Sequence, residues 1–194
     1  MNTLRVGLAM TGSFCTFEKA LDAFERLQGS YDLTPIMSDT AYGTDTRFGR
    51  AADHRARLSA LCGKEILHTI PEAEPIGPKH LLDVLLIAPC TGNTLAKLAR
   101  GVTDTAVTMA AKSHLRCDRP VLLAVSTNDG LSGSAGSIAA LLNRKNVYFV
   151  PFTQDDPVTK PHSLGADYAL LEASIEAAAR ERQLQPVLAR HLGE

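Results

Sequence analysis

Five short apolar runs recur along the chain and predict five β-strands. The runs read "LRVGLAM", "DLTPIM", "DVLLIAP", "PVLLAVS" and "NVYFVPF", at residues 4–10, 32–37, 83–89, 120–126 and 146–152. Each has the length of a strand, and most are rich in Val, Leu and Ile on both faces. Strands of that kind are typical of a parallel sheet that helices cover on both sides.

Helical periodicity fills the segments between these runs. In residues 16–27, Phe17, Leu21, Phe24 and Leu27 recur at spacings of three and four and form one apolar stripe. Further helices are predicted at residues 47–61, 94–100, 103–115, 134–143 and 166–182, and a surface connection at residues 70–78. The alternation of strand and helix predicts a doubly wound, Rossmann-like (flavodoxin-like) α/β fold. We expect a three-layer sandwich with a mostly parallel sheet, as a single domain over residues 1–194.

Composition and charge exclude several classes of protein. Apolar residues make up 45% of the 194 and charged residues 21%, which suits one sizeable core. The net charge of −1 provides no basic field for a nucleic acid, and no apolar run approaches the roughly 20 residues that span a bilayer. The segment "MNTLRVGLAM" reads as a strand and lacks the apolar core of a signal peptide. A cytoplasmic protein is expected, with no nucleic-acid or membrane partner.

The four cysteines, Cys15, Cys62, Cys90 and Cys117, form no CxxC pair. Their spacing suits neither a zinc site nor a small disulfide framework. Reduced and mostly buried thiols are therefore expected, without a bound metal.

Four of the predicted strands are followed by polar turns. The turns read "MTGSFC", "MSDTAYG", "PCTGNT" and "STNDGLSGS". In an open parallel sheet, ligands bind beyond the carboxyl ends of the strands, where such turns converge. Unpaired N–H groups at the helix that follows Thr11, Gly12 and Ser13 suit an anion, although Ser and Thr at this position also cap helices routinely. The chain contains neither GxGxxG nor GxxxxGK[ST].

The third and fourth turns can also be interpreted either as part of a ligand site or as ordinary capping and turn residues. Thr91 and Asn93 can simply cap the next helix, Cys90 can be a packing residue, and Asn128 and Asp129 can stabilise a turn. Each turn alone is a weak signal. Four of them at one edge of a sheet predict a site for a ligand the size of a mononucleotide.

The strings "VGLAMTGSF", "IMSDTA" and "IAPCTGNTLAKLARGVTDTAVTMAAKSHLR" resemble the FMN-binding flavoprotein superfamily, which contains cysteine decarboxylases and flavin prenyltransferases. Within it, "EPIGPKHLLDVLLIAPCTGNTLAK", "VSTNDGL" and "YFVPFTQDDPVTKPHSL" are similar to the family of dipicolinate synthase B subunits. The resemblance extends from residue 4 to about residue 171.

The resemblance implies FMN as the cofactor and assigns roles by matching positions. Thr11, Gly12 and Ser13 match a phosphate-binding loop, and Ser38 matches a second hydroxyl of the flavin site. The turn that packs on the ribityl chain and the isoalloxazine edge is matched by Thr91, Gly92, Asn93 and Thr94. Ser126 and Asn128 complete the implied site.

Two positions depart from the enzymes of known chemistry in the superfamily. Pro75 stands where the decarboxylases carry a histidine, and His80 lies too far along the chain to replace it. Ser126 stands where the prenyltransferases place an arginine near the flavin. Pro75 therefore disfavours cysteine decarboxylation. Ser126 leaves a prenyl phosphate without the positively charged arginine that would help to bind it.

The resemblance implies formation of pyridine-2,6-dicarboxylate from a dihydro- or hydroxytetrahydro-dipicolinate precursor during sporulation. It also implies an A subunit that carries NADP on a Rossmann domain, and a homo-oligomer, either a trimer or a dodecamer. Removal of a hydride and a proton makes a dihydropyridine aromatic, and a flavin can take the hydride. Two alternatives stay open: a flavin prenyltransferase-like enzyme, and a non-catalytic subunit that stabilises the A subunit.

A small dicarboxylate substrate needs positively charged or proton-donating partners. Lys112, His114 and Arg116 follow the third turn, while Lys160 and His162 follow the fifth strand and so are expected at the ligand edge. Lys160 and His162 are the predicted catalytic residues, because an imidazole can also move a proton near neutral pH. An exposed loop histidine without a role is the competing interpretation.

Overall fold

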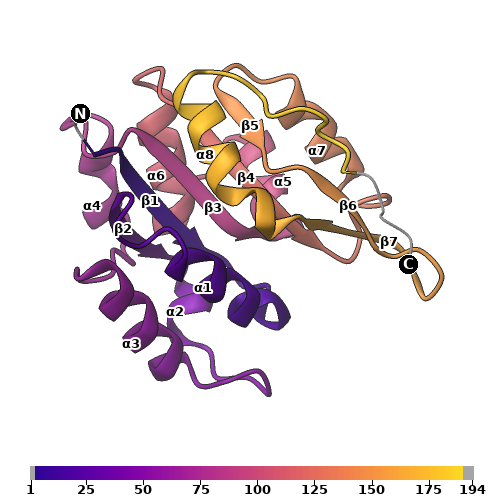
Figure 1. The fold of residues 1–194 in the computed structure, drawn as a ribbon, viewed down its shortest axis with the longest axis horizontal. Coiled ribbons are helices and arrows are strands. Elements are labelled where there is room, and N and C mark those ends of the chain that lie inside the picture. The colour runs from indigo at the N-terminus through magenta and orange to yellow at the C-terminus, as the bar shows by residue number, and fades with distance from the viewer. Residues whose placement is uncertain (1–2, 190–194) are drawn as a thin grey trace.

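Four of the five predicted runs form the central parallel strands in the computed structural model, which describes residues 3–189. These strands are β1 (Arg5–Met10), β2 (Asp32–Met37), β3 (Val84–Cys90) and β4 (Val121–Thr127). The fifth run forms only the short strand β5 (Val147–Phe149), which is parallel to β4. The sheet order is β2-β1-β3-β4-β7-β6, with β5 beside β4. The predicted doubly wound fold with a mostly parallel sheet is confirmed (Figure 1).

An antiparallel hairpin, which the sequence patterns did not predict, extends the sheet beyond β4. It consists of β6 (Phe152–Asp156) and β7 (Lys160–Ala166). β7 pairs antiparallel with the end of β4, where Ser126 faces Gly165 and Thr127 faces Leu164. The segment with Lys160 and His162 was expected to be a loop, and it is instead a strand.

The six predicted helices are present with changed ends, and two short helices, at residues 39–43 and 70–73, were not predicted. They are α1 (Phe17–Glu25), α2 (Asp39–Gly43), α3 (Ala51–Cys62), α4 (Ile70–Ala73), α5 (Gly92–Arg100), α6 (Ala106–Leu115), α7 (Ala135–Leu142) and α8 (Leu171–Ala179). Short 3₁₀ turns lie at η1 (Phe14–Thr16), η2 (Glu74–Ile76) and η3 (Tyr168–Leu170). Residues 70–78 are more than a surface connection, because they contain α4 and η2 and bury Ala73 and Ile76.

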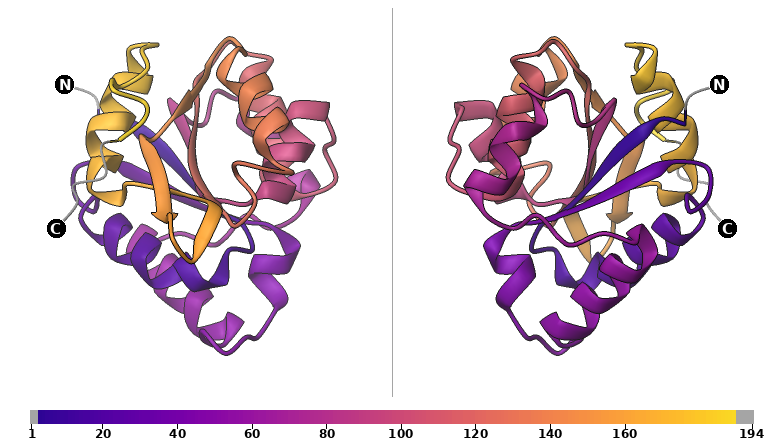
Figure 2. Two further views of the ribbon diagram at one scale, coloured as in Figure 1. Left: turned by 90° about the vertical axis from the view of Figure 1, so that its right-hand side faces the viewer. Right: turned by 90° about the vertical axis from the view of Figure 1, so that its left-hand side faces the viewer.

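Successive residues of the central strands point to opposite faces of the sheet. In β3, Val84, Leu86 and Ala88 belong to the core beneath α1, α3 and α8, whereas Leu85 and Ile87 belong to the core beneath α5, α6 and α7. Figure 2 shows the sheet between these two helical layers. Each strand face is therefore buried, which explains why the runs are continuously apolar. Within residues 3–189, no helix is long and apolar enough to cross a membrane.

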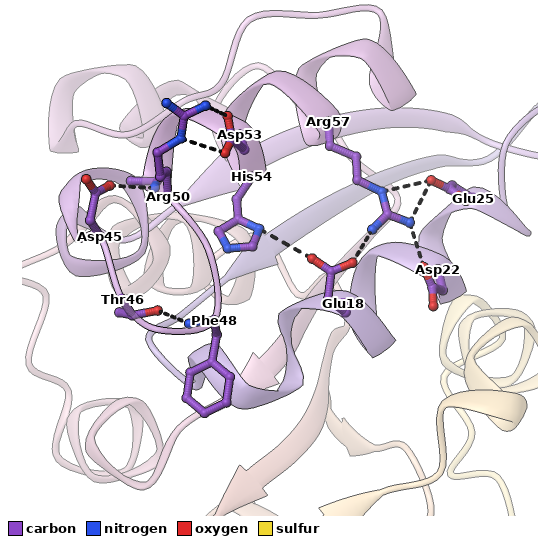
Figure 3. A network of polar contacts seen from close by, with 11 residues as sticks. Glu18, Asp22, Glu25, Asp45, Thr46, Phe48, Arg50, Asp53, His54 and Arg57 are labelled. Atoms are coloured by element: carbon purple, nitrogen blue, oxygen red, sulfur yellow. Dashed lines mark hydrogen bonds and ion pairs between the residues drawn. The ribbon is translucent and has the colours of Figure 1, made fainter.

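An arginine on α3 joins that helix to α1. Arg57 donates hydrogen bonds to Glu18, Asp22 and Glu25, at distances of 2.8, 2.6 and 2.9 Å (Figure 3). These hydrogen bonds, first that of Asp22, raise the pKa of the guanidinium. The contacts hold α3, and with it the loop that precedes α3, against α1.

One histidine is buried without a polar partner near the end of α6. His114 is fully buried, and neither of its ring nitrogens has a hydrogen-bond partner among the described residues. Burial is the main cause that lowers the pKa of His114 to about 4, and the charge of Arg119 adds to the effect. The backbone of Pro120 and then the charge and backbone of Asp83 oppose the shift. The folded protein therefore keeps this imidazole neutral.

Because the pKa of His114 is lowered in the folded protein, we expect the protein to lose stability in mild acid. Below a pH of about 6.5 the unfolded chain binds a proton on His114, whereas the folded chain binds it only near a pH of about 4. The free energy of unfolding is expected to fall by about 3 kcal/mol between these two pH values. Chemical denaturation across this range measures it. In His114→Leu the fall should be smaller by that amount, and an equal fall in both proteins would contradict the prediction.

Candidate functional site

A cavity of about 1050 Å³ opens at the carboxyl ends of β1, β3 and β4. Its volume suits a ligand the size of a mononucleotide. The first, third and fourth turns reach it, and β7 forms another wall. Of the predicted site residues, those that line the cavity are Gly12, Ser13, Thr91, Gly92, Asn93, Ser126, Asn128, Lys160 and His162.

Three hydroxyl groups meet at one end of the cavity. The Oγ atom of Ser126, at the end of β4, lies 2.7 Å from Ser13 Oγ and 2.8 Å from Thr16 Oγ1. Ser13 Oγ and Thr16 Oγ1 are 3.2 Å apart. Hydroxyl hydrogens rotate, so the three groups can all donate to one anion that enters between them. The first turn and β4 together therefore provide a cluster of donors suited to a phosphate.

The third turn approaches the cavity with its backbone. Thr91 is the N-cap of α5, and its Oγ1 atom accepts the N–H of Thr94 at 3.1 Å. A Cβ atom on Gly92 would lie 2.5 Å from Ser134 Oγ and 2.7 Å from Thr127 Oγ1. Only glycine fits there without displacing these groups, so the start of α5 packs against the fourth turn while Thr91, Gly92 and Asn93 line the cavity.

The fourth turn is stiffened by Asp129. Its Oδ1 atom accepts hydrogen bonds from Thr127 Oγ1 at 2.5 Å and from Ser134 Oγ at 2.7 Å. These bonds lower the pKa of Asp129, which therefore stays ionised. Leu131 N–H also donates to the carbonyl of His162, so the turn is tied to β7.

Three of the predicted cofactor residues, Thr11, Ser38 and Thr94, do not line the cavity. Thr11 ties the first turn to the third, because its hydroxyl donates to the Pro89 carbonyl at 2.7 Å and accepts the Thr91 N–H at 3.1 Å. Ser38 caps α2 and accepts the Ala41 N–H at 3.3 Å. Thr94 is buried at the start of α5. These side chains shape the turns, and a direct contact of theirs with a flavin stays a prediction.

The predicted catalytic residues are exposed on β7. Lys160 Nζ lies 3.1 Å from Asp155 Oδ2, and this carboxylate raises the pKa of the lysine. Asp155 also lines the cavity, so Lys160 is partly neutralised before any ligand enters. A catalytic role of Lys160 and His162 stays a prediction.

Several cavity residues were missed by the sequence patterns. They include Lys19 of α1, Arg47 and Phe48 of the loop before α3, and Tyr168 of η3. The predicted helix at residues 47–61 concealed Arg47 and Phe48, because α3 begins only at Ala51. Tyr168 is buried, and its hydroxyl has no hydrogen-bond partner among residues 3–189. The string "GTDTRFG" carried a signal, since glycines and polar residues are typical of a turn.

The other charged candidates lie away from the cavity. Lys112, His114 and Arg116 are at the end of α6, which leads into the amino end of β4, so they are at the opposite edge of the sheet. Neither Pro75 nor His80 lines the cavity.

The four cysteines are free, but the expectation that most are buried is wrong. Only Cys90 is buried, which raises the pKa of its thiol. Cys62 and Cys117 are half-buried, and Cys15 is exposed at the cavity. Cys15, Cys62 and Cys117 lie near the ends of helical segments, so the protein covers their thiols only in part. In the described part of the chain, no group of three or more His, Cys, Asp or Glu residues could hold a metal.

Similarity to known proteins identifies the family. The family model described as Flavoprotein matches residues 1–154. The chain belongs to the Flavoprotein family. Among known proteins, the B subunit of dipicolinate synthase from Bacillus subtilis (strain 168) is 43% identical over 186 residues, which are 95% of this chain and 92% of that protein. The predicted family is confirmed.

Solved structures agree with this family assignment. The dipicolinate synthase B subunit from Bacillus halodurans has a TM-score of 0.88 at 41% identity, over 98% of this chain and 99% of that chain. An FMN-dependent cysteine decarboxylase, SpaF, has a TM-score of 0.67 at 18% identity, over 92% of this chain and 97% of that chain. The likeness to the decarboxylase supports the flavodoxin-like fold alone.

Proposed function

We propose that this Flavoprotein family member binds FMN in the cavity and acts as the B subunit of a dipicolinate synthase. The observation that carries the FMN part is the hydroxyl cluster of Ser13, Thr16 and Ser126 beside the glycine turn at Gly92. The similarity to dipicolinate synthase B subunits over nearly the whole of both chains supports the rest.

The residues of the cavity fit FMN. Ser13, Thr16 and Ser126 would hold the phosphate, and the Lys19 ammonium at the same cavity would balance part of its charge. Gly92 would let the third turn pack closely against the fourth turn, and this packing would hold the backbone of Thr91, Gly92 and Asn93 at the cavity where the flavin would lie. Bound FMN supplies the capacity to accept a hydride.

The substrate would be a dihydro- or hydroxytetrahydro-dipicolinate precursor, and the product pyridine-2,6-dicarboxylate. Aromatisation of the dihydropyridine removes a hydride and a proton. His162 would hold or pass on the proton, and Lys160 would attract a substrate carboxylate in competition with Asp155. An A subunit that carries NADP would be the partner, and the chain would assemble as a homo-oligomer, a trimer or a dodecamer.

The cavity supports this reaction better than the two other chemistries of the superfamily. At the place where prenyltransferases carry an arginine, Ser126 is engaged by Ser13 and Thr16. The decarboxylase histidine is replaced by Pro75, which lies in η2 and outside the cavity lining. Neither a prenyl phosphate nor a cysteine substrate would meet its expected partner.

Reduction of the bound flavin by the substrate tests the proposal. The chain is loaded with FMN and mixed with the dihydrodipicolinate precursor without oxygen, both alone and with the A subunit. We expect the visible flavin absorbance to bleach while pyridine-2,6-dicarboxylate forms. A chain that binds no FMN would overturn the redox role.

The same assay separates the non-catalytic alternative. A chain variant that folds without binding FMN is combined with the A subunit. If product still forms at the wild-type rate, the chain serves only to stabilise its partner.

A further inference from the structure

The loop between α2 and α3, residues 44–50, brings an arginine and an aromatic side chain to the cavity. Arg47 and Phe48 both line it. The Arg47 guanidinium lies 4.8 Å from the centre of the Phe48 ring, in a cation–π contact. Phe48 is 41% exposed, so the pair stands at the rim of the cavity.

The backbone of this loop is held in a tight turn. Thr46 N–H donates to the Gly49 carbonyl at 3.0 Å, and Gly49 N–H donates back at 3.1 Å. Phe48 N–H donates to Thr46 Oγ1 at 3.1 Å, and the Asp45 carboxylate accepts the N–H of Ala51 at 2.8 Å (Figure 3). The loop is therefore ordered before any ligand arrives.

A buried histidine of α3 supports the turn from below. His54 is 4% exposed, and its Nε2 atom lies where a Cβ atom on Gly49 would be only 2.5 Å away. Its Nδ1 atom is 3.9 Å from Glu18 Oε1, and its ring contacts Phe17 edge-on. Glu18 also pairs with Arg57, so the same carboxylate contacts both residues of α3 (Figure 3). The turn therefore packs where α1 and α3 meet.

Arg47, like Lys19, forms no ion pair with a carboxylate among residues 3–189, whereas the other two cations nearby do. Lys160 is paired with Asp155, and Arg50, three residues after Arg47, is paired with Asp53 at 2.8 Å. Lys19 lies one helical turn after Thr16 and beside the Tyr168 ring, close to the hydroxyl cluster. The guanidinium at the rim is thus available for an incoming anion.

We propose that Arg47 is a positioning residue that binds one carboxylate of the dicarboxylate substrate. A guanidinium presents two parallel N–H donors to a carboxylate, which fixes the orientation of the ligand as well as attracting it. Phe48 supports the guanidinium, and Gly49 and His54 fix the turn that presents it. The inference rests on the proposed function and names the residue that recognises its substrate class.

Equilibrium binding of pyridine-2,6-dicarboxylate to the FMN-loaded chain tests this role. In Arg47→Met the affinity is expected to fall about 10- to 100-fold, because a charge-assisted bidentate contact is lost. Arg47→Lys should bind with intermediate affinity, since it keeps the charge without the paired donors. Arg50→Met is the matched control and should bind as the wild type does. FMN affinity should be unchanged in all three.

The outcomes separate the inference from the proposed function. If the wild type binds the dicarboxylate and Arg47→Met binds it equally well, Arg47 has no such role. If the FMN-loaded wild type does not bind the dicarboxylate, the proposed substrate class is wrong and the inference falls with it. Gly49→Ala gives a second readout, because displacing the turn should weaken dicarboxylate binding while Arg47 itself is retained.

Discussion

FMN binding is expected to weaken at least about 100-fold when Gly92 is replaced by valine. A Cβ atom at this position would lie 2.5 Å from Ser134 Oγ, 2.7 Å from Thr127 Oγ1 and 2.9 Å from Asp129 Oδ1. The two hydroxyls both donate to the Asp129 carboxylate, so none of the three groups can retreat without breaking a hydrogen bond. The third turn must therefore move away from the fourth turn, and the cavity residues Thr91, Gly92 and Asn93 would move with it, out of the arrangement proposed to hold the flavin.

Titration of FMN, followed by quenching of its fluorescence, measures this loss. Circular dichroism and thermal unfolding show whether the variant is folded. Gly136→Ala is the matched control, because nothing lies within 4 Å of a Cβ atom there, and it should bind FMN normally. A folded Gly92→Val protein with wild-type affinity would remove the third turn from the flavin site.

A large loss of stability is expected for Gly77→Ala, with the free energy of unfolding lower by about 3 kcal/mol. A Cβ atom on Gly77 would lie 1.9 Å from the backbone oxygen of Ser113. The Gly77 N–H donates to Ser113 Oγ at 2.9 Å, and that hydroxyl donates to the Glu74 carbonyl at 2.5 Å. A methyl group would separate η2 from α6, break these buried hydrogen bonds and loosen the packing around Ile76.

Denaturation in urea at neutral pH measures this effect. Gly136→Ala again provides the comparison, since an alanine inside α7 without a clash should stabilise the protein by up to about 1 kcal/mol. A loss in Gly77→Ala of less than about 1 kcal/mol would mean that η2 can slide along α6 at little cost.

The central strands were predictable because two helical layers bury both of their faces. Val84 to Ala88 are all buried, and this leaves an unbroken apolar run in the sequence. β6 and β7 leave no such run, because they lie toward the sheet edge and carry exposed polar residues, together with Pro161. Their pairing with β4 comes from tertiary contacts.

The predicted start of α3, at residue 47, was wrong for a physical reason. Helical periodicity has no sharp boundary, so the pattern extended the helix back to Arg47. Gly49 has φ of +138°, which a helix does not tolerate, and the Asp45 carboxylate accepts the first N–H of α3. These local contacts end the loop at Arg50 and leave Arg47 free to face the cavity.

The sequence by itself determined the fold class and the edge of the sheet at which the cavity opens. Strand periodicity and turn residues are local signals, and parallel strands bring their carboxyl ends to one edge. Only the tertiary structure decided which side chains share the cavity. Lys19, Arg47 and Lys160 come from α1, a loop and β7, and Thr11, Ser38 and Thr94 turn away to cap and tie backbone. Such grouping depends on packing between distant segments, which local pattern does not encode.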